Sequence, residues 1–302
     1  MEEIVSGIFV EDRYGPYNVG LVTLDEGTLV VDVPPRPADA RQWLREAQET
    51  AGVIRYIVLT DSQPERLIGA AQWDVPIIAG EATARLLTAM VREEAEWEEV
   101  LEAADISTPG IADELTTLKP RRARLACTHH LLLHNQDPPL EIEAAAGAAP
   151  GALWLYVPNQ KVLFAGDTVA FQTPPVLSQT PDSKAWLNAL GTLAHRKSIH
   201  RIVPGRGARE ILRGELESQR EFMRVIRRTA RNLTRKAEPG EGLTQATNEL
   251  QQAFFPSLKK NSEPLQRIRK GLEHLVNEML AEQQADEEST HLPPARTGGT
   301  PD

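Results

Sequence analysis

The spacing of apolar residues divides the first two hundred residues into short strands and amphipathic helices. Short apolar and β-branched runs bounded by Gly, Pro and Asp are typical of strands, whereas apolar positions three or four residues apart are typical of helices. The first half of this region predicts, in chain order, strands at 7–10, 20–24 and 28–33, a helix at 38–50, a strand at 54–59, a polar loop at 60–66, a strand at 75–78 and a helix at 81–104. The strand at 54–59 is apolar except for Arg55, which indicates burial on both faces of a sheet.

The second half of this region repeats the same alternation. It predicts strands at 128–133, 140–143, 153–157 and 161–164, a helix at 182–195 and a strand at 201–203. Pro158 and Asn159 supply a tight turn between two of these strands. Because both halves mix strands with helices, the pattern predicts an α/β (α+β) protein in which packed sheets are covered by helices.

The chain changes character after residue 207. The pattern there predicts helices at 208–236, 243–254 and 264–282, with a Gly- and Pro-containing linker between the first two. From about residue 284 the sequence is polar and rich in Pro, Gly and Thr, which indicates a disordered tail. The predicted organisation is therefore a mixed domain at 1–207, a helical extension at 208–283 and a tail at 284–302.

Composition and charge exclude several classes of protein. The 302 residues are 41% hydrophobic and 25% charged, which is ordinary for a globular chain. No apolar run approaches the roughly 18 residues of a membrane span, and the acidic start lacks the layout of a signal peptide. The single cysteine, Cys127, excludes an internal disulfide framework and favours a cytoplasmic location. The net charge of −10 lies within residues 1–206, because 207–302 contain 15 Lys+Arg and 15 Asp+Glu, and it argues against general nucleic-acid binding.

Several segments, taken in chain order, resemble the motifs of one protein family. They are Asn18-x-Gly20 and the segments at 27–32, 162–167, 186–190 and 203–207. Together they resemble the metallo-β-lactamase superfamily over nearly all of residues 1–207. The resemblance implies an αββα sandwich with a metal site at one sheet edge. The helical extension resembles tails that some superfamily hydrolases place over the mouth of the active site.

The departures from the family motifs fall on the metal ligands. The stretch at 60–66 stands where the family has Thr-His-x-His-x-Asp-His, and two further histidines are also replaced. The former active-site positions are Asp61, Gln63, Glu65, Arg66, Ala148, Asp167 and Arg206. Only Asp167 keeps its family identity, and no position carries the imidazole or thiolate that zinc usually requires. We therefore expect no zinc, and without it no water activated for hydrolysis.

The replacements suggest that side chains fill the space of the metal ions. Arginine stays protonated and binds carboxylates through its planar fork. Our hypothesis is that Arg66 and Arg206 hold Asp61, Glu65 and Asp167 in an ion-paired cluster. One alternative is that these loops have diverged and face solvent. Another is that Asp61, Gln63, Glu65 and Asp167 form an oxygen-ligated Mg²⁺, Ca²⁺ or Mn²⁺ site. The charges of the two nearby arginines would oppose a cation there.

A second group of metal-binding residue types lies between 127 and 134. It contains Cys127, His129, His130 and His134. A metal site or a Cys–His site is one interpretation. The segment aligns to a strand remote from the family's active site, so a partly exposed strand face is the favoured interpretation.

The predicted helix at 208–236 has a basic face. Its arginines recur at steps of three and four residues: Arg220, Arg224, Arg227, Arg228, Arg231 and Arg235. A solvated face is the favoured interpretation. A docking surface for an acidic partner is the alternative, and the glutamates of the helix at 81–104 could pair with it within the chain or across a homodimer.

Three functions remain open from the sequence. The leading one is a non-catalytic member of the fold, a pseudoenzyme with a metal-free former active site that binds an unknown small molecule or protein. The second is a hydrolase with a reworked or oxygen-ligated metal site. The third is an assembly protein that acts through the helical extension, for example by forming a homo-oligomer.

Overall fold

The computed structural model describes residues 1–104, 114–115, 117–134, 136–235 and 242–290. Its first sheet has seven strands in sequence order. The first four pair antiparallel and the last three join in parallel. The strands are β1 (Glu2–Val5), β2 (Ile8–Glu11), β3 (Val19–Leu24), β4 (Gly27–Val31), β5 (Ile54–Val58), β6 (Ile77–Gly80) and β7 (Ala123–Cys127).

The second sheet has six strands in the order β13-β12-β11-β10-β9-β8. Its one parallel pair joins β11 to β12, and the other neighbours are antiparallel. The strands are β8 (His130–Leu133), β9 (Leu140–Ala144), β10 (Leu153–Val157), β11 (Val162–Phe171), β12 (Arg201–Gly207) and β13 (Ile211–Leu212).

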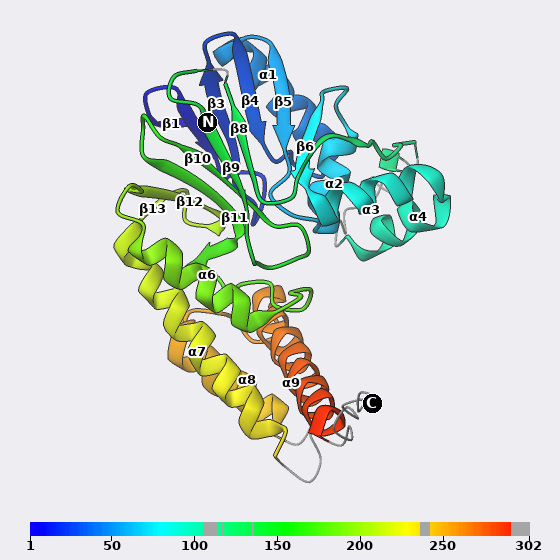
Figure 1. Ribbon diagram of the computed structural model, residues 1–302, viewed down its shortest axis with the longest axis vertical. Helices are drawn as coiled ribbons and strands as arrows, with labels where there is room; N and C mark the ends of the chain where they lie inside the picture. The colour runs from blue at the N-terminus through cyan, green and yellow to red at the C-terminus, as the bar shows by residue number, and fades with distance from the viewer. Residues whose placement is uncertain (105–113, 116, 135, 236–241, 291–302) are drawn as a thin grey trace, which may run out of the picture.

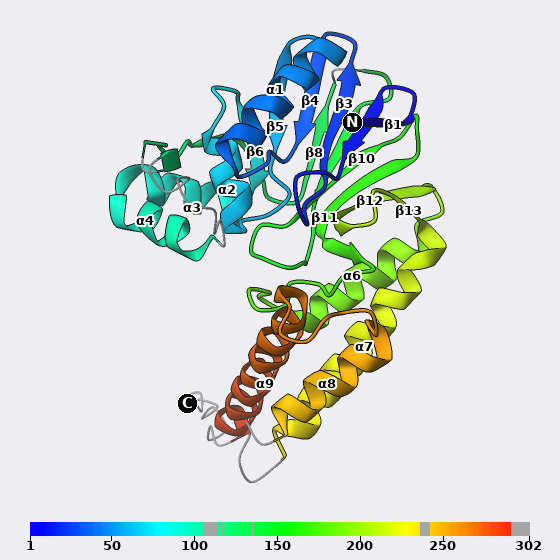
Figure 2. The same cartoon turned by 180° about the vertical axis from the view of Figure 1, so that it is seen from behind.

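Helices cover the outer face of each sheet and complete four layers (Figures 1 and 2). The first sheet is covered by α1 (Pro37–Ala51), α2 (Pro64–Ala71), α3 (Glu81–Arg92) and α4 (Glu94–Ala103). The second is covered by α6 (Ser183–His195) and α7 (Leu216–Leu233), whereas α8 (Leu243–Phe254) and α9 (Glu263–Thr290) pack against α7 and extend beyond the sheet (Figure 1). The αββα sandwich implied by the resemblance is therefore confirmed.

An apolar layer joins the two sheets. Side chains of alternate positions on β2, β4, β9, β10 and β11 meet there, among them Ile8, Leu29, Ile142, Leu155 and Phe164. The Phe164 ring of the second sheet packs directly on Gly20 of the first, where an added Cβ would lie 2.2 Å from the ring. Packing therefore explains the glycine of the Asn18-x-Gly20 motif, since no larger residue fits at position 20.

The C-terminal helices pack on the second sheet and on one another. Phe222 of α7 contacts both Phe254 and Phe255, with ring centroids 5.3 and 5.2 Å apart. The expected helix at 208–236 starts later than predicted, because 211–212 form β13 and Arg213–Glu215 form a short 3-10 helix. The last helix continues to Thr290, so the predicted tail at 284–302 is helical in its first part. Residues 291–302 lie outside the described residues.

Other element predictions need correction. The predicted helix at 81–104 is two helices, because Glu93 adopts an extended backbone between them. The predicted strand at 128–133 is confined to β8, and β7 before it belongs to the other sheet. β1, β13 and α2 were not predicted. Among the described helices, none combines the length and apolarity needed to cross a membrane.

Candidate functional site

The loop after β5 brings the first group of site residues together. Asp61 accepts a hydrogen bond from the backbone nitrogen of Gln63 (3.0 Å), which fixes the turn into α2. Pro64 stands at the first position of that helix, where its missing N–H costs nothing. Arg66 follows within the first helical turn and points into the protein, with only 2% of its surface exposed.

Two strands of the second sheet bring the other group. Asp167 lies on β11, and Arg206 lies on the parallel neighbour β12. Asn18 holds the end of β12, because its Nδ2 donates to the carbonyl oxygens of Pro204 and Ala208, both at 2.9 Å. Gly205 allows the close approach, since an added Cβ there would lie 2.2 Å from Asp167 Oδ1.

Arg66 hydrogen-bonds two buried carboxylates and lies beside a third, although its Nε makes no hydrogen bond among the described residues. Nη1 donates to Asp32, Nη2 donates to Asp167 Oδ1 at 2.6 Å, and Nε lies 3.3 Å from Asp61 Oδ1. Asp32 also accepts from the backbone nitrogen (3.0 Å) and hydroxyl (2.7 Å) of Thr60. The guanidinium therefore joins three carboxyl groups that come from three separate segments of the chain.

Arg206 holds the opposite side of the same cluster. Its Nε donates to Asp167 Oδ2 at 2.5 Å and its Nη2 donates to Gln63 Oε1 at 2.7 Å. Its guanidinium carbon lies 4.5 Å from the centroid of the Tyr17 ring. Asp167 thus lies between two arginines, one on each carboxylate oxygen.

Burial and charge divide the carboxyl groups into two kinds. Burial raises the pKa of Asp61 to about 7, although the charge of Arg66 opposes the shift. Burial also opposes ionisation of Asp167, but the charges of Arg206 and then Arg66 outweigh it and lower that pKa to about 2. Burial disfavours the charge on both arginines, yet the carboxylates outweigh it and raise their pKa values. The arginines therefore stay protonated, and Asp61 is the group that titrates near neutrality.

The structure separates the seven predicted positions. Asp61, Gln63, Arg66, Asp167 and Arg206 meet in one buried cluster. Glu65 is half-buried and lines a cavity beside that cluster instead of joining it. Ala148 is fully buried among the apolar side chains between the second sheet and its helices and supplies no polar atom.

Asp32 is the residue that sequence reasoning missed. The motif at 27–32 was used only as a sign of the fold, although its final aspartate ends β4 beside the site. The structure gives that aspartate a left-handed backbone (φ 56°) and a direct ion pair with Arg66. A lone aspartate at the end of an apolar strand, facing a buried arginine on the next loop, was the available signal.

The cluster does not fit the zinc site that the fold implies. Its ligand atoms are carboxylate and amide oxygens without an imidazole or thiolate. The Arg66 guanidinium occupies the centre between Asp32, Asp61 and Asp167, so a cation there would face a permanent positive charge at hydrogen-bond distance. Within the described residues, Gln63 Nε2 is a buried donor that lacks a partner, and a cation would not satisfy it.

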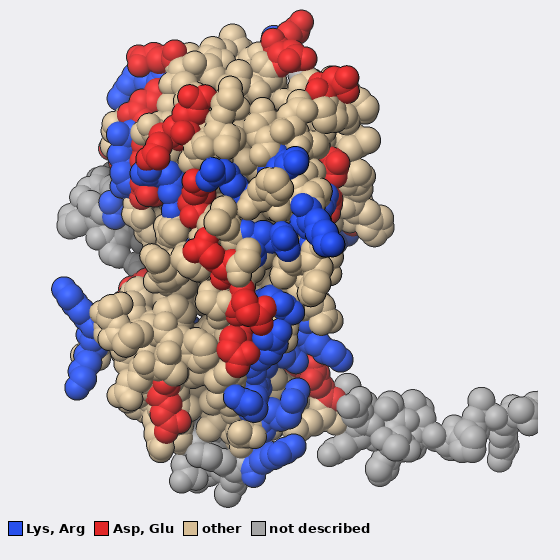
Figure 3. Space-filling model, turned by 90° about the vertical axis from the view of Figure 1, so that its left-hand side faces the viewer, with Lys and Arg blue, Asp and Glu red and all other residues tan. Residues whose placement is uncertain are grey.

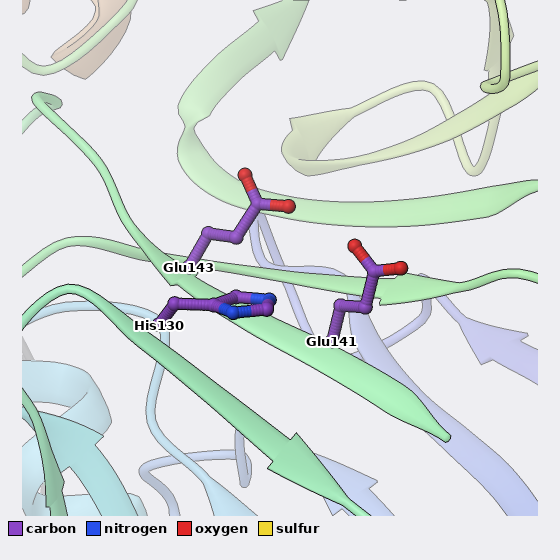
Figure 4. Close-up of side chains that lie close together, drawn as sticks. All are labelled: His130, Glu141 and Glu143. Carbon is purple, nitrogen blue, oxygen red and sulfur yellow. The ribbon is translucent and has the colours of Figure 1, made fainter. Parts of the chain in front are cut away.

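A separate group could hold a metal ion on the outer face of the second sheet (Figure 4). Ligand atoms of His130, Glu141 and Glu143 lie within 4.8 Å of one another. Arg196 already pairs with both carboxylates, at 3.0 Å from Glu141 and 2.6 Å from Glu143. A metal ion would therefore compete with the Arg196 guanidinium for the same oxygens.

The remaining members of the 127–134 group lie apart from these ligands. Cys127 ends β7 in the first sheet and is buried, with Sγ 3.6 Å from the Ile142 carbonyl oxygen. His129 and His134 are exposed. Cys127 and His129 do not share a strand face, because β7 ends at Cys127 and the chain then changes sheets.

The basic face of α7 is partly neutralised by its own helix. Arg220 and Arg224 pair with Glu217, and Arg224 also pairs with Glu221. Arg227 is buried and donates to Ser183 of α6. Figure 3 shows basic side chains gathered on the lower, helical part of the molecule with acidic ones among them. The acidic helix α4 lies beside the first sheet, away from α7, so the within-chain pairing is not formed (Figure 1).

Comparison with known proteins places the fold in a family. Residues 12–227 match the family model of the metallo-beta-lactamase superfamily. The chain belongs to this superfamily. No curated protein matches the sequence.

Solved structures of superfamily members show the same fold. The metallo-beta-lactamase family protein TTHA1429 from Thermus thermophilus is 17% identical with a TM-score of 0.62, and the match covers 94% of this chain and 96% of that one. DIM-1 metallo-beta-lactamase is 15% identical with a TM-score of 0.56, covering 74% and 96%. The sec-alkylsulfatase Pisa1 from Pseudomonas sp. is 15% identical with a TM-score of 0.60, covering 97% and 52%.

Proposed function

We propose that this chain is a non-catalytic binding protein on a metallohydrolase fold, in which Arg66 and Arg206 replace the metal ions. The observation that supports it most directly is the Arg66 guanidinium, whose three nitrogens each face a different buried carboxylate. Its charge balances the same acidic groups that a cation would balance. It has no open coordination position, so it cannot activate a water molecule as zinc does.

The oxygen-ligated hydrolase is the weaker candidate. A hard cation such as Mg²⁺ needs several oxygens around one point, and Arg66 lies at the point nearest to Asp32, Asp61 and Asp167. Binding such an ion would require this arginine to leave a site in which it is 2% exposed. That movement would expose three carboxyl groups to one another without their shared partner.

Metal content and turnover together test the proposal. The full chain is purified without chelator from zinc-supplemented cells, and metals are measured by elemental analysis beside esterase, phosphodiesterase and β-lactam hydrolysis assays. The matched variant is His130→Ala, which removes the separate metal-binding group on the second sheet. We expect less than stoichiometric metal in the His130→Ala protein and no turnover.

Two results would overturn the proposal. The first is a full equivalent of metal that persists in His130→Ala, together with hydrolysis that Asp167→Asn abolishes. Metal that disappears with His130→Ala, without turnover, assigns the ion to the outer group and leaves the arginine cluster as proposed. Turnover that Asp167→Asn leaves intact would contradict the non-catalytic proposal by a route outside the cluster.

A further inference from the structure

A cavity of about 220 Å³ opens directly beside the arginine cluster. Its lining comes from the loop at 14–17, from Pro35 and Arg36, from Glu65 and Arg206, and from Glu263 and Arg267 of α9. The helical extension therefore forms one wall and the sandwich forms the others. Pockets for drug-sized molecules have volumes of about 300–1,000 Å³, so this cavity suits a smaller ligand.

The wall that α9 provides is already satisfied. Arg267 is 7% exposed and grips Glu263 with two nitrogens, Nη2 to Oε2 at 2.7 Å and Nε to Oε1 at 3.1 Å. Its third nitrogen, Nη1, donates to the Pro174 carbonyl oxygen at 2.9 Å. This pair contributes no net charge and leaves little for a ligand to bind.

Arg36 and Arg206 supply the N–H groups that remain. Arg206 uses Nε and Nη2 within the cluster, where Asp167 balances its charge, and Nη1 has no hydrogen-bond acceptor among the residues that the structure describes. Arg36 is exposed and has no ion pair with any residue of the described ranges. Glu65 is the one carboxylate of the lining outside the satisfied pair. Arg36 is therefore the one cation of the described lining that no carboxylate pairs, although the whole chain carries a charge of −10.

Aromatic and proline rings form the other walls. They consist of the rings of Tyr14 and Tyr17 and of Pro16 and Pro35. Burial and then the charge of Glu65 raise the pKa of Tyr17, so its hydroxyl stays protonated and can donate a hydrogen bond. Such walls accept a small organic body, whereas a fully hydrated inorganic ion would leave them unused.

We propose that this cavity binds a small organic anion, a carboxylate or a phosphate monoester, with its charged group held by Arg36 and Arg206 Nη1. Guanidinium groups are suited to both kinds of anion because their paired N–H groups match two oxygens. The organic body lies against Tyr14 and Tyr17, and Glu65 accepts a hydrogen bond from a hydroxyl group of the ligand. The inference rests on the proposed binding function and names its ligand class.

Binding is measured on the full chain by calorimetry and by thermal shift. The probes are lactate, glycerol 3-phosphate, acetate and inorganic phosphate, with choline as a cationic control. Arg36→Gln removes the exposed cation of the cavity. Arg45→Gln is its matched control, since Arg45 is an exposed arginine of α1 that does not line the cavity.

We expect lactate or glycerol 3-phosphate to bind and to raise the melting temperature, and choline to have no effect. Arg36→Gln should weaken binding by roughly tenfold or more, whereas Arg45→Gln should leave it unchanged. The stronger of the two hydroxylated probes identifies the anionic group. Glu65→Gln should reduce the preference for lactate over acetate.

Two results would overturn the inference. One is that none of the four anions binds at millimolar concentration. The other is that Arg36→Gln and Arg45→Gln affect binding equally, which would mean that surface charge alone attracts the anion. Metal is measured on the same samples, so a metal-free chain that binds no anion refutes only the ligand assignment. A full equivalent of metal in His130→Ala, together with hydrolysis that Asp167→Asn abolishes, refutes the proposed function.

Discussion

Replacing Arg66 with methionine removes the cation shared by three buried carboxyl groups while keeping an unbranched side chain. Removing one partner of a buried ion pair costs about 3–5 kcal/mol, because the other partner stays buried and uncompensated. Asp32, Asp61 and Asp167 are each at most 2% exposed, so water cannot replace the lost contacts. At about 2 °C per kcal/mol for a large domain, the melting temperature should decrease by roughly 6–10 °C.

Urea unfolding and thermal melting of Arg66→Met test this magnitude. The control is Arg85→Met, since Arg85 is 70% exposed and pairs with Glu81 one helical turn away, an interaction worth about 0.3–0.5 kcal/mol. The loss in Arg66→Met should become smaller as the pH decreases, because protonated carboxyl groups no longer need a cation. If Arg66→Met does not fold, Arg66→Lys keeps the charge without the fork and should lose less. A change within about 1 kcal/mol of the control would refute the idea that this arginine replaces a metal ion.

Three further predictions follow from the same contacts. Asp61 has a folded pKa of about 7 against an ordinary value of 3.8, so the native state binds the extra proton and the wild type should lose stability as the pH rises from about 4 to 7. In Asp61→Asn, the free energy of unfolding by urea should depend less on pH, and an equal dependence in both proteins would contradict this. Gly205→Ala should cost about 1–3 kcal/mol in the same assay, because its Cβ would overlap Asp167; a neutral effect would show that the strands can separate. Arg196→Ala should increase the zinc affinity of the His130/Glu141/Glu143 group by about tenfold or more, and His130→Ala should abolish zinc binding there. Both are measured by competition with a chromophoric chelator. Tighter zinc binding by the wild type than by Arg196→Ala would mean that the arginine does not compete.

The sequence predicted the sandwich well because its strands are local patterns. The mostly apolar runs at 54–59 and 153–157 match β5 and β10 almost residue for residue, although Arg55 is exposed and β5 is not buried along its whole length. The misses lie where tertiary contacts decide the local structure. β13 has two residues and exists only because it pairs with β12, and the break at Glu93 reflects two helices that pack separately.

The site was predictable only in part, for a related reason. Arg66 and Arg206 were identified because their motifs align with the family's ligand positions, and the structure does bring them to one carboxylate, Asp167. Periodicity could not predict the carboxylates that pair with Arg66. Asp32 follows β4, Asp61 follows β5 and Asp167 lies on β11 of the other sheet. Asp32 was missed because its motif was used only as a sign of the fold. Glu65 was misplaced because one residue along a helix turns the side-chain direction by about 100°.

The two arginines differ in a way that metal replacement alone does not require. Arg66 has a carboxylate beside each of its nitrogens and lies at the centre of the cluster, where no ligand reaches it in the proposed function. Arg206 spends two nitrogens inside and forms part of the cavity wall. Two metal ions would both offer open coordination positions to one ligand. In the proposed function, Arg66 is instead structural and Arg206 binds the anion. The position of the inner arginine therefore argues against hydrolysis, and the position of the outer one argues for recognition of an anion.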